Sequence, residues 1–248
     1  MAPCRNLSML DDLREILDRL NWARLEIDVL KTDIYQKGAA AFRRSTKPHE
    51  SRFSTNITII EPTATMPVSI SARTGSIINE TRSCLDALAS TLAIRNGRTT
   101  GGVYFPITET QEEFEDKHKG QAKIRKLLPS DQRRVATFRP YLRADDGNTG
   151  NILLWGLHRA DVIRKHTRLI ARQAYSSLLA LGDQVIPIPM QLIQGEHGVT
   201  FGIDDPNASV VVYPMFCFDE PDVLKNREVL KTLNQFVSMV ESIVKSFS

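Results

Sequence analysis

Hydrophobic residues recur at three- and four-residue steps over residues 8 to about 45, with charged residues of both signs at the positions between them. This spacing predicts an amphipathic helix whose apolar side faces a core. The same spacing predicts helices over about 71–95 and, at the end of the chain, over about 222–247. Residues 151–181 predict a further long helix with apolar residues on nearly every side, which is typical of a central, buried helix.

β-branched residues gather in another part of the chain. Residues 53–70 combine a β-branched run at 57–60 with a turn at 61–65, and this pattern predicts a β-hairpin. Two or three strands are predicted over 183–218. A lone hairpin is marginal in water, so we expect 53–70 to pair with the later strands in one antiparallel sheet.

These elements predict an α+β fold: mainly a helical bundle with an attached antiparallel β-sheet. No linker rich in Pro, Gly or Ser divides the chain, and its length is sufficient for one buried core, so we expect a single domain over residues 1–248. The predicted helical core comprises about 8–45, 71–181 and 222–247, and the β elements comprise about 53–70 and 183–218.

Composition limits the class of protein. The chain is 42% hydrophobic and 25% charged, as is ordinary for globular proteins. No apolar run approaches the roughly 20 residues that a membrane helix needs. Cys4, Cys84 and Cys217 are far apart and form no CxxC pair, which gives little support to a disulfide framework or to structural zinc. We therefore expect a cytoplasmic protein without membrane association.

Positive charge is concentrated in the middle of the chain. Between Lys117 and Arg172, fourteen Lys and Arg residues face four Asp residues, while the whole chain carries only +3. Such a block favours a phosphate-rich partner such as RNA; alternatively, the acidic flanks neutralise it within the fold or across a dimer. Neighbouring aromatic residues either stack bases or pack in the core; they are Phe138, Tyr141 and Trp155. The candidate nucleic-acid-binding residues are Lys123, Arg125, Lys126, Arg133 and Arg134.

Familiar catalytic motifs are missing. The sequence contains no GxxxxGK[ST], GxGxxG, HExxH, GxSxG or DxDxDG pattern, and its five histidines do not cluster. Nucleotide-dependent and metal-dependent catalysis therefore lack positive support, and we expect no cofactor.

Charged residues on predicted apolar arcs are the strongest clues to a site. Arg82 lies four residues before Asp86, so the two can pair along one helix. Asp161 and Arg164 lie on the apolar side of the 151–181 helix. Buried charges are costly unless paired, so the four residues either satisfy one another or line a cleft that meets a phosphate. We predict that the two helices pack side by side, with Arg82 within reach of Asp86 or Asp161.

Residues 75–89 resemble the helix G-x-x-I-x-x-x-R-S-x-L-D-H-L of a large family of bacterial and phage proteins. Tyr104–Ile107 resembles that family's FPI strand, Arg139–Tyr141 its QPY, and Asp161–His166 its D-x-x-(D/R)-K-H. These blocks cover roughly residues 70 to 170 in the right order. The family has no established activity to carry over.

The family's R-x4-H pattern is similar to the R-x4-6-H motif of HEPN-type helical ribonucleases. That resemblance implies a HEPN-like bundle, often dimeric, in which His transfers a proton and Arg stabilises the phosphate without metal. Arg159 and His166 fit the spacing, whereas Arg82 is followed by Ala87 where the family often has His. The candidate catalytic residues are Arg82, Asp86, Arg159 and His166.

The leading hypothesis is a HEPN-like helical protein that binds RNA or another phosphate-rich partner, with enzymatic activity left open. The alternative is a non-catalytic interaction module or homo-oligomeric scaffold that associates through its amphipathic terminal helices. A third option is a metal-independent endoribonuclease that uses Arg159 and His166.

Overall fold

In a computed structural model, the chain forms two compact units. The single domain stays a prediction, because a compact unit is not necessarily an independently folding domain. The structure describes residues 11–39, 42–51, 54–62, 67–145, 147–166, 171–181, 184–192, 199–202 and 208–248. Unit 1 comprises Met1–Ile27, Gly75–Leu169 and Thr232–Ser248; unit 2 comprises Asp28–Thr74 and Ile170–Lys231.

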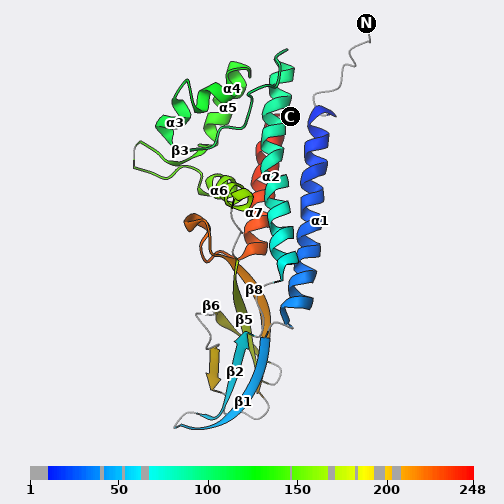
Figure 1. Cartoon of the computed structure of the whole chain (residues 1–248), viewed down its shortest axis with the longest axis vertical. Coiled ribbons are helices and arrows are strands. Elements are labelled where there is room, and N and C mark those ends of the chain that lie inside the picture. Colours follow the sequence, from blue (N-terminus) through cyan, green and yellow to red (C-terminus); the bar gives the residue numbers. More distant parts are fainter. Residues whose placement is uncertain are drawn as a thin grey trace. The chain divides into compact units, whose positions relative to one another are not determined.

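Helices dominate the structure, as the sequence predicts. Within unit 1, α1, α2 and α7 run side by side, and α6 is seen nearly end-on across them (Figure 1). No described helix combines the length and apolar character that crossing a membrane requires. The helices are α1 (Asp11–Ala39), α2 (Val68–Arg95), α3 (Gln111–Glu115), α4 (Gly120–Ile124), α5 (Pro129–Thr137), α6 (Ile152–His166), the 3-10 helix η1 (Asp222–Leu224) and α7 (Val229–Lys245).

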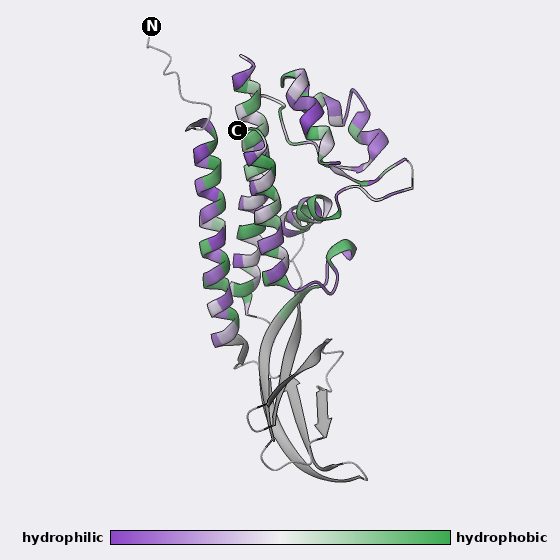
Figure 2. Ribbon diagram, turned by 180° about the vertical axis from the view of Figure 1, so that it is seen from behind, coloured by the Kyte–Doolittle hydropathy of each residue, from purple (hydrophilic) through white to green (hydrophobic). Residues whose placement is uncertain are grey.

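The helical core is built from the positions whose spacing predicted the helices. On α1 the buried residues recur every three or four positions, and hydrophobic and hydrophilic residues alternate along the long helices in Figure 2. Phe236 of α7 is fully buried. Burying one such side chain contributes about 1.5–3 kcal/mol. The buried residues of α1 are Leu13, Ile16, Leu20, Ala23, Ile27, Leu30 and Ile34.

Partly exposed ion pairs tie the long helices of unit 1 together. Arg19 Nε of α1 lies 2.5 Å from Glu80 Oε1 of α2. Arg24 Nη2 lies 2.6 Å from Glu241 Oε2 of α7. Such pairs each contribute little to stability, so the apolar core is what holds these helices together.

Unit 1 also contains a two-stranded sheet of β3 (Thr108–Thr110) and β4 (Tyr141–Arg143). Its strands are parallel, with Thr108 opposite Tyr141. The chain between them carries α3, α4 and α5, and such a crossover returns the second strand in the same direction. The prediction of one attached antiparallel sheet is therefore wrong for the strands among the helices.

In unit 2 the antiparallel strands form two three-stranded sheets instead of one, in the orders β1-β2-β7 and β6-β5-β8. The predicted pairing of the 53–70 region with a later strand is present, because Ile60 of β2 lies opposite Val199 of β7. The other later strands belong to the second sheet. The bounds are β1 (Phe42–Ser51), β2 (Ser54–Pro62), β5 (Ala171–Leu181), β6 (Gln184–Leu192), β7 (Val199–Gly202) and β8 (Ala208–Phe218).

The helix predicted over 151–181 is too long. It ends at His166, and Ala171–Leu181 forms β5, which pairs with β8 along its whole length, from Ala171 opposite Phe218 to Leu181 opposite Ala208. β5 lies between β6 and β8, so its backbone N–H and C=O groups form hydrogen bonds on both sides. These hydrogen bonds outweigh the intrinsic helix propensity of the segment, which is a weak effect.

Three other boundaries differ from the prediction. The first helix ends at Ala39, and the chain then forms β1, the actual hairpin partner of β2. Val68, predicted to lie in that hairpin, begins α2 instead. The last helix begins at Val229 rather than near 222, because Asn226 has a left-handed backbone (φ 66°) that a continuous helix does not accommodate.

Prolines lie in edge strands of both sheets in unit 2. Pro48 lies in β1, Pro187 and Pro189 lie in β6, and Pro214 lies in β8. Each of these strands is outermost in its sheet, whereas Pro62 is the last residue of the central strand β2. Proline has no N–H to give to a neighbouring strand, so an edge is where it is tolerated.

Candidate functional site

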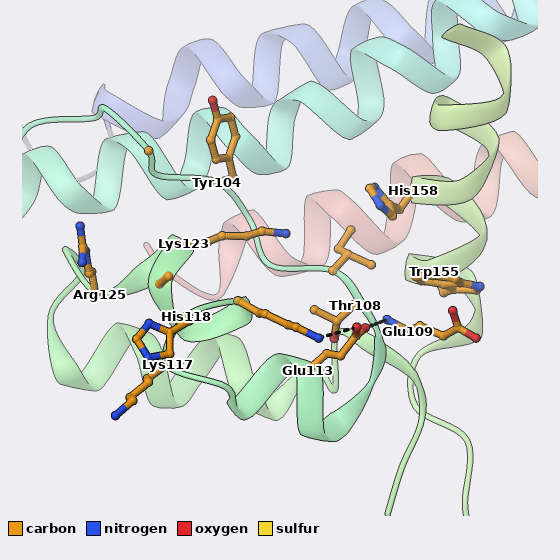
Figure 3. Close-up of a pocket in the computed structure, with 14 residues that line it drawn as sticks. Tyr104, Thr108, Glu109, Glu113, Lys117, His118, Lys123, Arg125, Trp155 and His158 are labelled. Carbon is orange, nitrogen blue, oxygen red and sulfur yellow. Dashed lines mark hydrogen bonds and ion pairs between the residues drawn. The ribbon is translucent and has the colours of Figure 1, made fainter. Parts of the chain in front are cut away.

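An open cavity of about 810 Å³ in unit 1 is the most prominent candidate site. Its wall comes from the segment after α2, from α3 and α4 with the loop between them, and from α6 (Figure 3). Four cationic side chains face it against the two carboxylates of Glu109 and Glu113, and Tyr104 and Trp155 supply aromatic surface. The cations are Lys117, Lys119, Lys123 and Arg125.

Close packing of α3 against α4 sets the shape of this wall. The Thr110 hydroxyl caps α3 by accepting a hydrogen bond from the Glu113 N–H, at 3.1 Å. Gly120 begins α4, and a Cβ placed there would collide with the backbone of Phe114 in α3. Only glycine lets the two short helices approach so closely, and this approach brings Lys123 of α4 to the cavity.

Arg82 and Asp86 hold the extended segment behind the cavity. Arg82 Nη1 lies 2.7 Å from Asp86 Oδ1, and Arg82 Nη2 donates to the Phe105 carbonyl at 3.2 Å. The Phe105 N–H donates to Asp86 Oδ1 at 2.9 Å. The predicted pairing of Arg82 with Asp86 is confirmed. Arg82 is 7% exposed and does not line the cavity, so its side chain acts on the backbone of Phe105.

The packing of α2 against α6 agrees with the sequence prediction. Arg164 Nη2 donates to Asn79 Oδ1 of α2 at 2.7 Å and lies 3.2 Å from Oδ1 of the buried Asp161. The Arg164 stem covers Gly75, where a Cβ would come within 2.6 Å of its Cδ. Arg164 thus joins the two helices, and the carboxylate of Asp161 balances its charge.

His158 of α6 lines the cavity in a positively charged environment. Burial, followed by the charges of Arg82 and Lys123, lowers the pKa of His158 to about 4, although Asp161 opposes the shift. Burial, followed by Arg82, also lowers the pKa of Lys123. His158 is therefore neutral near pH 7 and can exchange hydrogen bonds with a ligand. No sequence pattern indicates this role, because helix spacing alone does not bring His158 near α4.

The neutral state of His158 has a measurable consequence. In the unfolded chain, His158 has a pKa of about 6.5 and takes up a proton as the pH falls below that value. In the folded protein, His158 stays neutral until the pH approaches 4. The His158 contribution to stability is therefore fully present above pH 6.5 and is lost as pH falls toward 4. We expect its imidazole NMR signals not to titrate between pH 5 and 8. A His158→Gln variant should lose less stability than wild type between pH 6.5 and 4; titration of His158 near pH 6.5 would contradict this.

The five predicted nucleic-acid-binding residues divide into three groups. Lys123 and Arg125 line the cavity. Lys126 Nζ donates to Thr99 Oγ1 at 3.0 Å and to the Gly101 carbonyl at 2.7 Å. Arg134 donates to the Ser246 carbonyl and lies over the Phe247 ring, 5.5 Å from its centroid, whereas Arg133 is exposed on α5. The structure thus brings two of the five to the cavity.

The aromatic candidates also differ in position. Tyr141 is buried, and Phe138 packs 6.2 Å from Phe247, centroid to centroid. Trp155 lines the cavity. Tyr104, which the sequence did not single out for stacking, is 54% exposed at the cavity. Tyr104 lies in an otherwise apolar segment, so its exposure could not be predicted from the sequence.

Arg159 and His166, the candidate ribonuclease pair, lie on α6. The Arg159 guanidinium lies over the Trp155 ring, 5.8 Å from its centroid. His166 is the last residue of α6, and its side chain lies outside the described residues. Catalysis by this pair stays a prediction.

Among the side chains that the structure describes, no cluster of three His, Cys, Asp or Glu residues is arranged to hold a metal ion. Comparisons with protein-family models, curated proteins and solved structures find no match to the chain. The function is therefore inferred from the geometry of the cavity.

Proposed function

We propose that the protein binds a phosphate-rich partner, single-stranded RNA in the first place, through the cavity between α3, α4 and α6. The observation that carries this proposal is the combination of four cationic side chains with two aromatic ones around a single cavity of about 810 Å³. The HEPN-like resemblance of the helical region supports the same proposal.

Each kind of side chain has a role in such binding. Lysine and arginine neutralise backbone phosphates and release counterions. Tyrosine and tryptophan stack on unpaired bases, which a single strand can turn outward but a duplex cannot. A concave, basic and aromatic site therefore favours a single strand over a double helix.

Binding does not require catalysis in this proposal. Arg82 is 7% exposed and does not line the cavity, and Asp86 is itself an anion, so neither offers a phosphate a binding group. His158 lines the cavity, but its pKa of about 4 makes it a weak proton acceptor near pH 7, and a ribonuclease would also need an acid. Association through the terminal helices, the alternative hypothesis, remains compatible with RNA binding.

The test is a fluorescence-anisotropy titration of labelled single-stranded RNA at about 50 and 200 mM salt. We expect affinity to fall roughly tenfold over this range, with little dependence on base sequence. The double reversal Lys123→Glu/Arg125→Glu should weaken binding roughly tenfold at low salt and flatten the salt dependence.

The matched control is Arg14→Glu/Lys231→Glu, which changes net charge equally at two exposed positions outside the cavity. It should retain most of the affinity. Equal losses in both variants would mean that binding follows net charge and not the cavity. No binding by wild type at about 50 mM salt, where phosphate contacts are strongest, would favour the interaction-module hypothesis.

A further inference from the structure

The cavity has two chemically different ends. Trp155, His158 and Glu109 lie at one side in Figure 3, and Arg125 and the Lys117–His118 segment lie at the opposite side. Lys123 extends between them, with its ammonium group directed toward the His158 side. A uniform track for a polynucleotide backbone would carry cations along its length, so this polarity points to a smaller ligand with one aromatic and one anionic end.

The aromatic end is suited to a nucleobase. Arg159 lies over the Trp155 ring but does not line the cavity, whereas Trp155 forms part of the cavity wall. His158 lies beside it, 5.9 Å between ring centroids, at an angle of 51°. A neutral imidazole both donates and accepts hydrogen bonds, and a carboxylate such as Glu109 accepts from an exocyclic amine. Stacking and edge recognition are thus available together.

The opposite end is suited to phosphate. Arg125 and Lys117 are exposed at the cavity, and no carboxylate at that end lines it with them. Lys119 differs, because its ammonium lies 3.1 Å from Glu113 Oε1 and is already balanced. A guanidinium binds two phosphate oxygens at once, which a lysine does not. Arg125 is therefore the main phosphate anchor, with Lys123 between it and the base.

We propose that the cavity holds one nucleotide, its base against Trp155 and His158 and its phosphates at the opposite end, beside Arg125 and Lys117. This proposal rests on the proposed function, and it narrows the ligand from a polyanion to a single base with its phosphates. The volume of about 810 Å³ lies in the range of small-molecule sites. The source is either a free nucleotide or the phosphorylated end of an RNA strand, since both present the same chemistry.

Trp155 provides a direct readout. The chain contains two tryptophans, so a Trp22→Phe background leaves Trp155 as the sole indole emitter. We expect ADP to quench its fluorescence saturably and adenosine, which lacks phosphate, to bind at least tenfold more weakly. Arg125→Ala in this background should weaken ADP binding about tenfold, as for loss of a charge-assisted hydrogen bond. Arg133→Ala, an exposed arginine outside the cavity, should not.

Calorimetry tests the base end separately. Trp155→Leu should weaken ADP binding about tenfold, as for loss of one stacking partner, while pyrophosphate binding stays unchanged. Competition then identifies the source. Displacement of ADP by a 5′-phosphorylated oligonucleotide, but not by its 5′-hydroxyl form, supports a strand end, whereas no displacement by either supports a free nucleotide.

Failure of this inference is distinguishable from failure of the proposed function. No saturable quenching by ADP up to about 1 mM, with RNA anisotropy still sensitive to Lys123 and Arg125, would overturn the single-nucleotide site alone. Adenosine binding as tightly as ADP would also overturn it. Loss of both ADP and RNA binding would overturn both proposals, and ADP binding without RNA binding would leave the nucleotide site and remove RNA as the partner.

Discussion

Replacing Arg82 by alanine is expected to lower the free energy of unfolding by about 1–3 kcal/mol. The substitution leaves the Phe105 carbonyl without its donor and Asp86 without its positive partner, both beside a buried segment. Arg82 is buried, so the substitution removes a buried donor and its packing, whereas the Asp86 side chain is 34% exposed and keeps contact with water. Equilibrium denaturation in urea, followed by circular dichroism, measures the loss.

Lys245→Ala is the matched control for this prediction. Lys245 and Glu241 are also four residues apart on one helix, 2.7 Å between Nζ and Oε1, but the Lys245 side chain is 60% exposed. An exposed pair of this kind contributes about 0.3–0.5 kcal/mol. If Arg82→Ala cost no more than Lys245→Ala, the Arg82–Asp86–Phe105 arrangement would not be a structural support.

Gly120→Ala is expected to destabilise the protein by about 3 kcal/mol, the upper end for overpacking. The added methyl group would collide with the carbonyl oxygen, Cα and carbonyl carbon of Phe114. Backbone atoms do not rotate aside as the end of a side chain does, so α3 and α4 must separate. Because α4 carries Lys123, we expect the folded fraction to bind RNA more weakly as well.

Gly101→Ala is the appropriate comparison. A Cβ at Gly101 meets nothing within 4 Å, and its backbone is not in the left-handed region. It should change the free energy of unfolding by no more than about 0.5 kcal/mol, as most surface substitutions do. Equal effects of the two alanines would show that α3 and α4 do not pack as closely as described.

The sequence predicted the elements whose cause is local. Asn96–Gly97 marks the end of α2, and Gly97 has the left-handed backbone (φ 66°) expected after a helix. The apolar spacing of α1 and α7 gives their buried faces correctly. Ala171–Leu181 was mistaken for helix because its strand character comes from hydrogen bonds with β8, more than thirty residues away in places.

The candidate site was predictable to a similar extent. Arg82 and Asp86 are neighbours on one helix turn, so their pairing follows from spacing alone. Tyr104, Lys123 and His158 meet only because the chain crosses from α2 through α3 and α4 before reaching α6. The spacing of residues along one helix therefore does not predict that these three side chains line the same cavity. Among the cationic candidates, the structure separates side chains that face a ligand from those held by hydrogen bonds within the protein. Lys126, which donates to the Gly101 carbonyl, belongs to the second group.

The prolines of the outer strands bear on how unit 2 behaves at high concentration. An unpaired strand edge can template the addition of a strand from a second molecule, the first step toward aggregation. Pro48, Pro187 and Pro189 each remove one donor from such an edge, in β1 and in β6. Addition of strands from further molecules to either sheet is thus opposed at these edges.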